Sequence, residues 1–211
     1  MGRIIDQRSR NQKNRKTKNI IVIECEGKNK TEEVYFQNFQ SRENDFRIEF
    51  AYGNDTDPIT MIRRLTKYIT DKDINLKDGD IAYCVFDTDV SKKKQPQIEE
   101  ALKIAKEEGI EVIMSVPSFE IWYLLHLCYT TKPFTSNKKL IAELEKKLPE
   151  YNKSSNIYSL IKDYTNTAIE NAKKLEDIHT KDGQAICKID CNPSTYVYKT
   201  VEYILNQKNN S

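Results

Sequence analysis

The sequence predicts an α/β fold in which a mostly parallel, four-stranded sheet is flanked by helices. Four apolar runs of strand length alternate along the chain with amphipathic runs of helical length. The connections between the strand-like runs are too long for hairpins and have room for crossover helices. This alternation is typical of a parallel sheet with helices on both faces.

The first strand is predicted at 19–25, where β-branched residues dominate. Glu26-Gly27 ends it, and a helix is predicted at 31–40. The second strand is predicted at 46–52, where apolar and polar residues alternate with a period of two. That alternation indicates one exposed face and favours a place at the edge of the sheet.

The next helix opens at Asp57-Pro58, with Asp as the N-cap and Pro at the first helical position. The third strand, 81–86, is apolar throughout, which predicts that both of its faces are buried. A helix over 96–108 then leads to the fourth strand at 111–116.

The C-terminal part is expected to be helical, at 119–128, 137–148, 157–163, 168–177 and 195–206. We expect three parts in the chain: a basic, mobile N-terminal arm over 1–18, a core over 19–129 that holds the sheet, and a helical elaboration over 130–211 that packs on the core. The apolar run at 122–127 is typical of core, although it is also rich enough in aromatic residues to stack on bases.

Composition excludes little, but the distribution of charge is informative. Lys+Arg number 34 and Asp+Glu 32 in the 211 residues, so net charge does not indicate a nucleic-acid binder. The segment 1–18 nevertheless carries seven Lys or Arg against Asp6 alone, and it is either an arm that binds phosphates or a solvated tail. The sequence shows no signal-peptide pattern, and no apolar run reaches the roughly 20 residues of a membrane span. No membrane partner is therefore expected. Five cysteines, an odd number, favour a reduced, cytoplasmic protein.

Three acidic residues follow predicted strands. Glu26 comes after the first strand, and Asp87 and Asp89 come after the third. If these strands are neighbours, the three carboxylates lie at the edge of the sheet where α/β proteins bind ligands. A divalent cation would relieve their repulsion, and oxygen ligands suit Mg²⁺ or Mn²⁺. The alternative is structural, with one Asp capping a helix and the other lying in a turn.

Glu120 lies in the first turn of the helix after the fourth strand, at the same edge. It could be a further metal ligand or a general base, or it could simply stabilise the positive end of the helix dipole. Lys28 and Lys30 beside Gly27 could neutralise a phosphate group.

Other kinds of site have little support. Neither G-x-x-x-x-G-K-[ST] nor G-x-G-x-x-G occurs, so the common phosphate-binding loops are absent from the sequence. A Ser–His–Asp or Cys–His hydrolase is not indicated, because no G-x-S-x-G elbow exists and His126 lies in an apolar helix, as a core residue would. Cys187 and Cys191 lack a second ligand pair for zinc.

Four blocks of the chain resemble the RloB-like proteins, a group related to the AbiLii abortive-infection component and carrying a TOPRIM-like domain. The blocks are Ile21–Gly27 with Lys30-Thr31-Glu32 and Tyr35-Phe36, Cys84–Asp89, Ser118–His126, and Asn192–Thr195. In the TOPRIM domains of topoisomerases, primases and related nucleases, a glutamate and a glycine follow the first strand and D-x-D follows the third. The turn after Gly27 is one residue longer here than the usual family form, and a third aspartate found in some TOPRIM enzymes is missing.

The resemblance implies a TOPRIM-like nuclease core at 19–129, with Glu26, Asp87 and Asp89 as metal ligands. It places Glu120 and Lys30 near the same edge, and it raises the chance that Asn192, Ser194 and Thr195 face the site. Members of the group are associated with antiphage systems and often occur beside an ATPase, which this chain would need as a separate partner because it has no P-loop.

The sequence therefore predicts an enzyme, a Mg²⁺- or Mn²⁺-dependent nuclease that cleaves RNA or DNA in an antiphage or abortive-infection system. In this prediction Glu26 is a ligand or the base, and Lys30 holds a phosphate. The alternative is a non-catalytic TOPRIM-like subunit that docks on an ATPase. Which nucleic acid is bound, and whether the chain forms a homo-oligomer, is left open by the sequence. A primase or topoisomerase is not favoured, because no nucleophilic tyrosine is marked.

Overall fold

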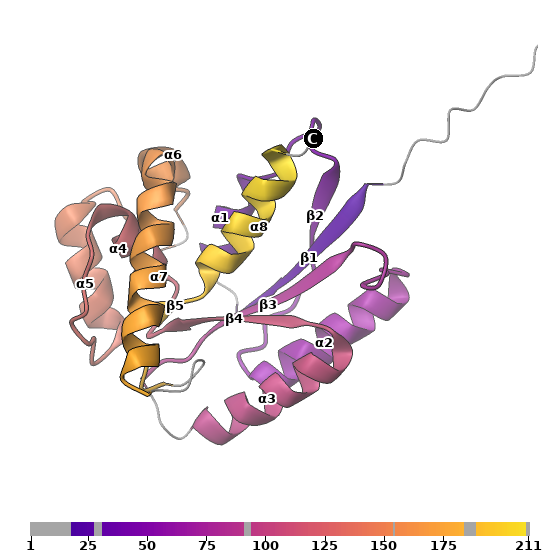
Figure 1. Ribbon diagram of the computed structural model, residues 1–211, viewed down its shortest axis with the longest axis horizontal. Coiled ribbons are helices and arrows are strands. Elements are labelled where there is room, and N and C mark those ends of the chain that lie inside the picture. Colours follow the sequence, from indigo (N-terminus) through magenta and orange to yellow (C-terminus); the bar gives the residue numbers. More distant parts are fainter. Residues whose placement is uncertain (1–17, 28–30, 91–93, 154, 184–188, 210–211) are drawn as a thin grey trace, which may run out of the picture.

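A five-stranded sheet runs through the molecule in the order β2-β1-β3-β4-β5 (Figure 1). The computed structural model describes residues 18–27, 31–90, 94–153, 155–183 and 189–209. The four longer strands are mutually parallel: β1 (Asn19–Cys25), β2 (Phe46–Phe50), β3 (Ile81–Asp87) and β4 (Glu111–Val116). The predicted α/β fold with a mostly parallel sheet is therefore confirmed, and β2 lies at the edge as its alternation indicates.

The sheet has a fifth strand in addition to the four that the sequence predicts. β5 (Ser194–Thr195) pairs antiparallel with the end of β4, with Ser115 opposite Thr195. The hydroxyl groups of these two residues form a buried hydrogen bond of 2.9 Å. The helix predicted to start at Thr195 starts instead at Val197, because the backbone before it belongs to the sheet.

Helices cover both faces of the sheet (Figure 1). On one face lie α2 (Pro58–Asp71) and α3 (Gln95–Glu108), and on the other lie α1 (Thr31–Gln37) and α8 (Val197–Asn209). Beside the sheet, at the left of the view, are α4 (Glu120–Leu127), α5 (Asn137–Lys147), α6 (Tyr158–Ile161) and α7 (Thr165–Lys181), with the 3₁₀ turn η2 (Lys162–Tyr164) joining the last two.

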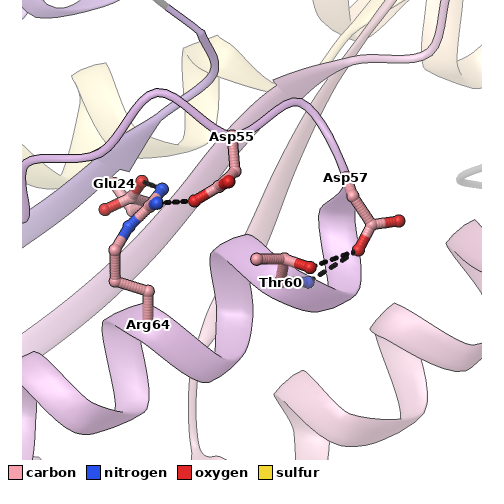
Figure 2. Close-up of polar contacts among 5 residues, drawn as sticks. All are labelled: Glu24, Asp55, Asp57, Thr60 and Arg64. Carbon is pink, nitrogen blue, oxygen red and sulfur yellow. Dashed lines mark hydrogen bonds and ion pairs between the residues drawn. The ribbon is translucent and has the colours of Figure 1, made fainter.

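Several helix ends follow from local chemistry. The predicted N-cap Asp57 accepts a 2.8 Å hydrogen bond from the backbone N–H of Thr60, and Pro58 occupies the first turn (Figure 2). Gly109 ends α3 in the left-handed conformation, with φ +71°. By contrast, α1 stops three residues before the predicted end at Gln40, because the Asn38 side chain donates to two carbonyls of its last turn.

An aromatic cluster joins α1 to α4. The ring of Tyr35 meets six others edge-to-face at centroid distances of 5.5 to 6.2 Å, those of Phe36, Phe39, Phe119, Trp122, Tyr123 and Tyr158. Trp122 and its neighbours in α4 are fully buried, so the core interpretation of 122–127 is confirmed for all but its last residue, Leu127, which is partly exposed. The cluster fixes the positions of α1 and α4, whose first turns line the pocket described below.

The predicted basic arm lies outside the described residues except for Lys18. The Lys18 ammonium donates to the carbonyl of Arg42 at 2.8 Å and to that of Asn44, which ties the start of β1 to the loop before β2. Among the helices of the described ranges, none is long and apolar enough to cross a membrane.

Candidate active site

Glu26 and Asp87 end neighbouring strands and contact each other. β1 and β3 pair in parallel with Cys25 opposite Val85, so the chain leaves both strands at the same edge of the sheet. Glu26 Oε2 accepts a 2.8 Å hydrogen bond from the backbone N–H of Asp87. The adjacency of these strands, on which the predicted site depends, is therefore confirmed.

A pocket of about 260 Å³ lies at this edge and brings together the four predicted acids. Its lining is Glu26, Gly27, Thr31, Glu32, Thr56, Asp87, Asp89, Glu120, Asn137 and Lys153. The lining comes from the ends of β1 and β3, the starts of α1, α4 and α5, and two loops. Lys30, the predicted phosphate clamp, lies outside the described residues, as does Lys28.

The backbone after β3 makes a sharp turn that is tied to β4. Thr88 N donates to the carbonyl of Ser115 at 3.0 Å, and Asp89 N donates to that of Pro117 at 3.1 Å. Asp89 has φ +47°, in the left-handed region that Asp tolerates better than most residues. Residues i and i+2 share a side only while the chain stays extended. Because the chain turns here, the spacing of Asp87 and Asp89 does not by itself place both side chains on one side.

Both carboxylate oxygens of Asp89 accept hydrogen bonds. Lys94 Nζ lies 2.6 Å from Oδ2, and Asn137 Nδ2 donates to Oδ1 at 2.8 Å. Lys94 lies just before α3 and Asn137 is the first residue of α5. Asp89 therefore connects these two helices while it lines the pocket.

Glu120 is held by two hydroxyl groups. It is only 3% exposed, and it accepts hydrogen bonds from Ser118 Oγ at 2.5 Å and from Tyr151 OH at 2.8 Å. Its place in the first turn of α4 also suits the helix dipole. Both interpretations from the sequence, a site acid and a dipole partner, are compatible with these contacts.

Glu32 is the acid of the pocket that the sequence argument did not select. It lies in the first turn of α1 and is 5% exposed, and its Oε2 is buried with no hydrogen-bond partner among the described residues. A glutamate at this position of a helix is ordinary, which is why the residue type alone gives no signal. The only hint was its place in the Lys30-Thr31-Glu32 block.

Burial and the proximity of other acids raise the pKa values of Glu26, Glu32 and Asp87. Burial raises the pKa of Glu32 to about 8, and the nearby charges of Glu120 and Glu26 add to the effect. The pKa of Asp87 is raised well above its usual range by burial, then by Glu32, Glu120, Glu26 and Asp89. Burial also raises the pKa of Glu26, although its hydrogen bond from Asp87 N opposes this. The pocket therefore favours either protons or a bound cation.

The donor chemistry fits a hard divalent cation. The acids offer oxygen ligands, as Mg²⁺ and Mn²⁺ prefer, and Glu32 Oε2 has no hydrogen-bond partner within the described part of the chain. Within the described ranges, no three His, Cys, Asp or Glu side chains already surround one metal position. Binding of a cation thus requires side chains such as Glu26 and Asp87 to rotate toward it.

A buried ion-pair network supports the loop on one side of the pocket. Arg64 of α2 bridges Glu24 of β1 and Asp55 in the loop after β2 (Figure 2). Glu24 is fully buried, so its charge would be costly without such a partner. A Cβ on Gly53 would collide with the Arg64 guanidinium, so a larger residue there would displace this group from its two carboxylate partners.

The same loop contacts the turn after β1. The Asp55 carbonyl accepts a 2.9 Å hydrogen bond from Gly27 N, and the adjacent Thr56 lines the pocket. Gly27 has φ +67°, which explains the glycine without reference to a ligand. Nothing in the sequence pattern marks Arg64 or Asp55 as parts of this support.

Two other candidates lie away from the pocket lining. His126 is 2% exposed, its Nδ1–H donates to the Trp122 carbonyl at 2.8 Å, and burial lowers its pKa to about 4, as for a core histidine. Asn192 exchanges hydrogen bonds with the backbone of Phe134, and Thr195 bonds to Ser115. The 192–195 block thus braces β4 and the loop before α5 and does not line the pocket.

Comparison with known proteins gives one match. A family model described as RloB-like protein matches residues 21–204. The match includes the described acids of the pocket and extends through most of α8. No curated protein and no solved structure matches the chain.

Proposed function

Because the chain belongs to the RloB-like protein family, which is associated with defence systems, we propose that it is a divalent-metal-dependent nuclease. The proposed reaction is hydrolysis of phosphodiester bonds in RNA or DNA. The observation that carries the proposal is the pocket at the carboxyl edge of the sheet, where Glu26 and Asp87 meet Glu32 and Glu120. Glu26, Glu32 and Asp87 have raised pKa values, and acids with raised pKa values at a shared edge are typical of a cation site in phosphoryl-transfer enzymes.

In this proposal Glu26 and Asp87 hold Mg²⁺ or Mn²⁺, and Asp89 lies on the outer side of the same site. A bound cation would supply Lewis-acid stabilisation of the phosphate and a more acidic water. Glu120, oriented by Ser118 and Tyr151, is placed to accept a proton from an attacking water.

The cations around the pocket would hold the substrate. Lys153 lines it, and Lys94 reaches its rim through Asp89, so both can neutralise a phosphate group. Lys30 is proposed to act in the same way from the turn after β1. The order of the parallel strands, with acids after β1 and β3, supports a TOPRIM-like assignment for this core.

The defence role is proposed to involve an ATPase from a separate chain. No P-loop motif occurs in the sequence, so nucleotide hydrolysis has no obvious place in this protein. Such a partner would couple the recognition of infection to the nuclease.

A cleavage assay tests the nuclease proposal. Labelled single- and double-stranded RNA and DNA are incubated with the wild-type protein in Mg²⁺, Mn²⁺ or EDTA, and with Asp87→Asn in the same buffers. We expect metal-dependent cleavage by the wild type and a loss of at least about 100-fold in Asp87→Asn, because a metal ligand is removed. Asp78→Asn is the matched control, since Asp78 is an exposed acid in the turn before the opposite end of β3. Equal rates for Asp87→Asn and the wild type in Mn²⁺ would refute the assignment.

A second candidate function is a non-catalytic subunit that docks on an ATPase. The observation that favours it is the complete engagement of Asp89 by Lys94 and Asn137, which leaves this predicted ligand already paired. A wild-type protein that is folded, binds an ATPase and neither binds Mn²⁺ nor cleaves any of the four substrates would support this candidate and contradict the nuclease.

A further inference from the structure

Among the described acids that line the pocket, Glu32 is one of the two that are buried, the other being Glu120. Its carboxyl group enters from the first turn of α1, while Glu26 and Asp87 enter from the ends of β1 and β3. The side chain is 5% exposed, and Oε2 has no hydrogen-bond partner in the described part of the chain. A buried carboxylate oxygen left without a donor is unfavourable, so a missing ligand is the economical explanation.

The neighbouring residue shows that this arrangement is specific. Glu33, also in the first turn of α1, accepts a 2.9 Å hydrogen bond from Gln37 Nε2 one turn later. Glu33 does not line the pocket, whereas Glu32 does. The two glutamates are equally suited to the helix dipole, so the dipole does not explain why Glu32 is buried among other acids.

The electrostatic effects on the pKa of Asp87 also connect Glu32 with the acids at the ends of β1 and β3. Among the charged groups that raise the pKa of Asp87, Glu32 has the largest effect, ahead of Glu120, Glu26 and Asp89. The neighbour in the D-x-D pair is thus not the acid most strongly coupled to Asp87.

Asp89 is in the opposite situation. Its two oxygens already accept hydrogen bonds from Lys94 and Asn137, and its side chain is 43% exposed. To bind a cation directly, Asp89 would have to break an ion pair and release the start of α5. Glu32 Oε2 has no hydrogen bond to a described residue that it would lose on binding a cation.

We propose that Glu32 is a direct ligand of the divalent cation together with Glu26 and Asp87, and that Asp89 holds Lys94 and Asn137 instead of the cation. This inference rests on the proposed metal site and changes its ligand set. It implies that α1 forms one wall of the site, so a residue from a helix replaces the second aspartate of the D-x-D pair.

Mn²⁺ binding measured by electron paramagnetic resonance tests the ligand set without reference to activity. Wild type, Glu32→Gln and Asp89→Asn are titrated, with Glu33→Gln as the matched control from the same helical turn. We expect Glu32→Gln to weaken Mn²⁺ binding by at least about tenfold, because one charged ligand is lost. Asp89→Asn should weaken it by no more than about threefold, as expected for a group outside the first coordination shell that is already paired. Glu33→Gln should bind like the wild type.

The outcomes separate this inference from the proposed function. If the wild type binds Mn²⁺, and Glu32→Gln binds it equally well while Asp89→Asn does not, Glu32 is not a ligand and the D-x-D assignment holds. If the folded wild type binds no Mn²⁺, the metal site itself is wrong. Glu32→Asp keeps the negative charge but shortens the side chain by one methylene, so this variant should also weaken Mn²⁺ binding. It is used in place of Glu32→Gln if Glu32→Gln does not fold.

Discussion

A carboxyl group loses its hydration when it is buried, and Glu32 loses nearly all of it without gaining a donor for Oε2 from any residue that the structure describes. At the scale of single residues, the pocket is a set of acids whose charges are only partly compensated. Glu120 is satisfied by two hydroxyl groups and Asp89 by Lys94 and Asn137. Glu32 and Asp87 are therefore the residues at which a ligand would have the largest effect.

The raised pKa of Glu32 makes the stability of the metal-free protein depend on pH. The folded pKa of about 8 lies above the ordinary value of 4.5, so the folded state binds the extra proton. The stabilisation from this proton is fully present below pH 4.5 and is lost as the pH rises through 8. Glu32→Gln avoids this loss, and we expect it to raise Tm by roughly 5 °C at pH 8.5 and to change it little at pH 4.5.

Thermal unfolding followed by circular dichroism, in EDTA and in excess Mn²⁺, measures the effect. Mn²⁺ should stabilise the wild type at pH 8.5 more than Glu32→Gln, because the cation replaces the proton. Equal pH dependence of Tm in the two proteins would show that Glu32 does not carry the buried charge.

Lys94 is expected to oppose metal binding. Its ammonium lies 2.6 Å from Asp89 Oδ2 at the rim of the pocket, where its charge repels a cation. Lys94→Gln should therefore bind Mn²⁺ at least about threefold more tightly than the wild type, but it should cleave no faster because a phosphate-binding charge is lost. Lys103→Gln, an exposed lysine of α3, is the control. Weaker Mn²⁺ binding by Lys94→Gln than by Lys103→Gln would contradict this view of the rim.

The site residues differ in how far sequence could predict them. Glu26, Asp87 and Asp89 follow apolar strands, where acids are conspicuous, and all line the pocket together with Glu120. Glu32 sits where helices ordinarily carry glutamate, so its burial depends on the packing of α1 and is invisible in the pattern. Asn137, Thr56 and Lys153 reach the pocket only through tertiary folding.

At the scale of elements, the loop between β2 and α2 is held by a charge network. Arg64→Met should destabilise the protein by about 3–5 kcal/mol, because it leaves Glu24 buried without its guanidinium partner. Urea unfolding measures the loss. The exposed neighbour Arg63→Met is the control and should cost less than about 0.5 kcal/mol.

A second variant distinguishes the ion pair from simple packing. In the double variant Glu24→Gln/Arg64→Met the buried charge is removed with its partner, so part of the lost stability should return. A double variant less stable than Arg64→Met would show that Glu24 contributes through contacts other than this pair.

The elements themselves were predictable where hydrophobic patterns are long. β1, β3 and β4 are apolar runs and β2 alternates with a period of two, so all four strands and the place of β2 at the edge were predictable. The adjacency of β1 and β3 was a condition of the predicted site, and only the fold shows it. β5 has two residues and owes its conformation to pairing with β4, so no local pattern could predict it. The end of α1 was missed because the Asn38 side chain competes for its last carbonyls.

At the scale of the whole molecule, the fold brings distant parts of the chain to one edge of the sheet. Strand ends supply Glu26 and Asp87, α1 and α4 supply Glu32 and Glu120, and the C-terminal part supplies Lys153. The aromatic cluster around Tyr35 fixes α1 against α4, so the two helical acids keep their positions relative to the strands. The account depends on this convergence serving a cation.

A crystal structure of the wild-type protein soaked in Mn²⁺, with anomalous diffraction recorded at the manganese edge, tests the central claim most directly. The account predicts an anomalous peak in the pocket, with Glu26 and Asp87 oxygens at about 2.0–2.3 Å and Glu32 completing the protein ligands. A folded protein whose pocket stays without an anomalous peak at millimolar Mn²⁺, or whose Mn²⁺ lies only elsewhere, would contradict the account.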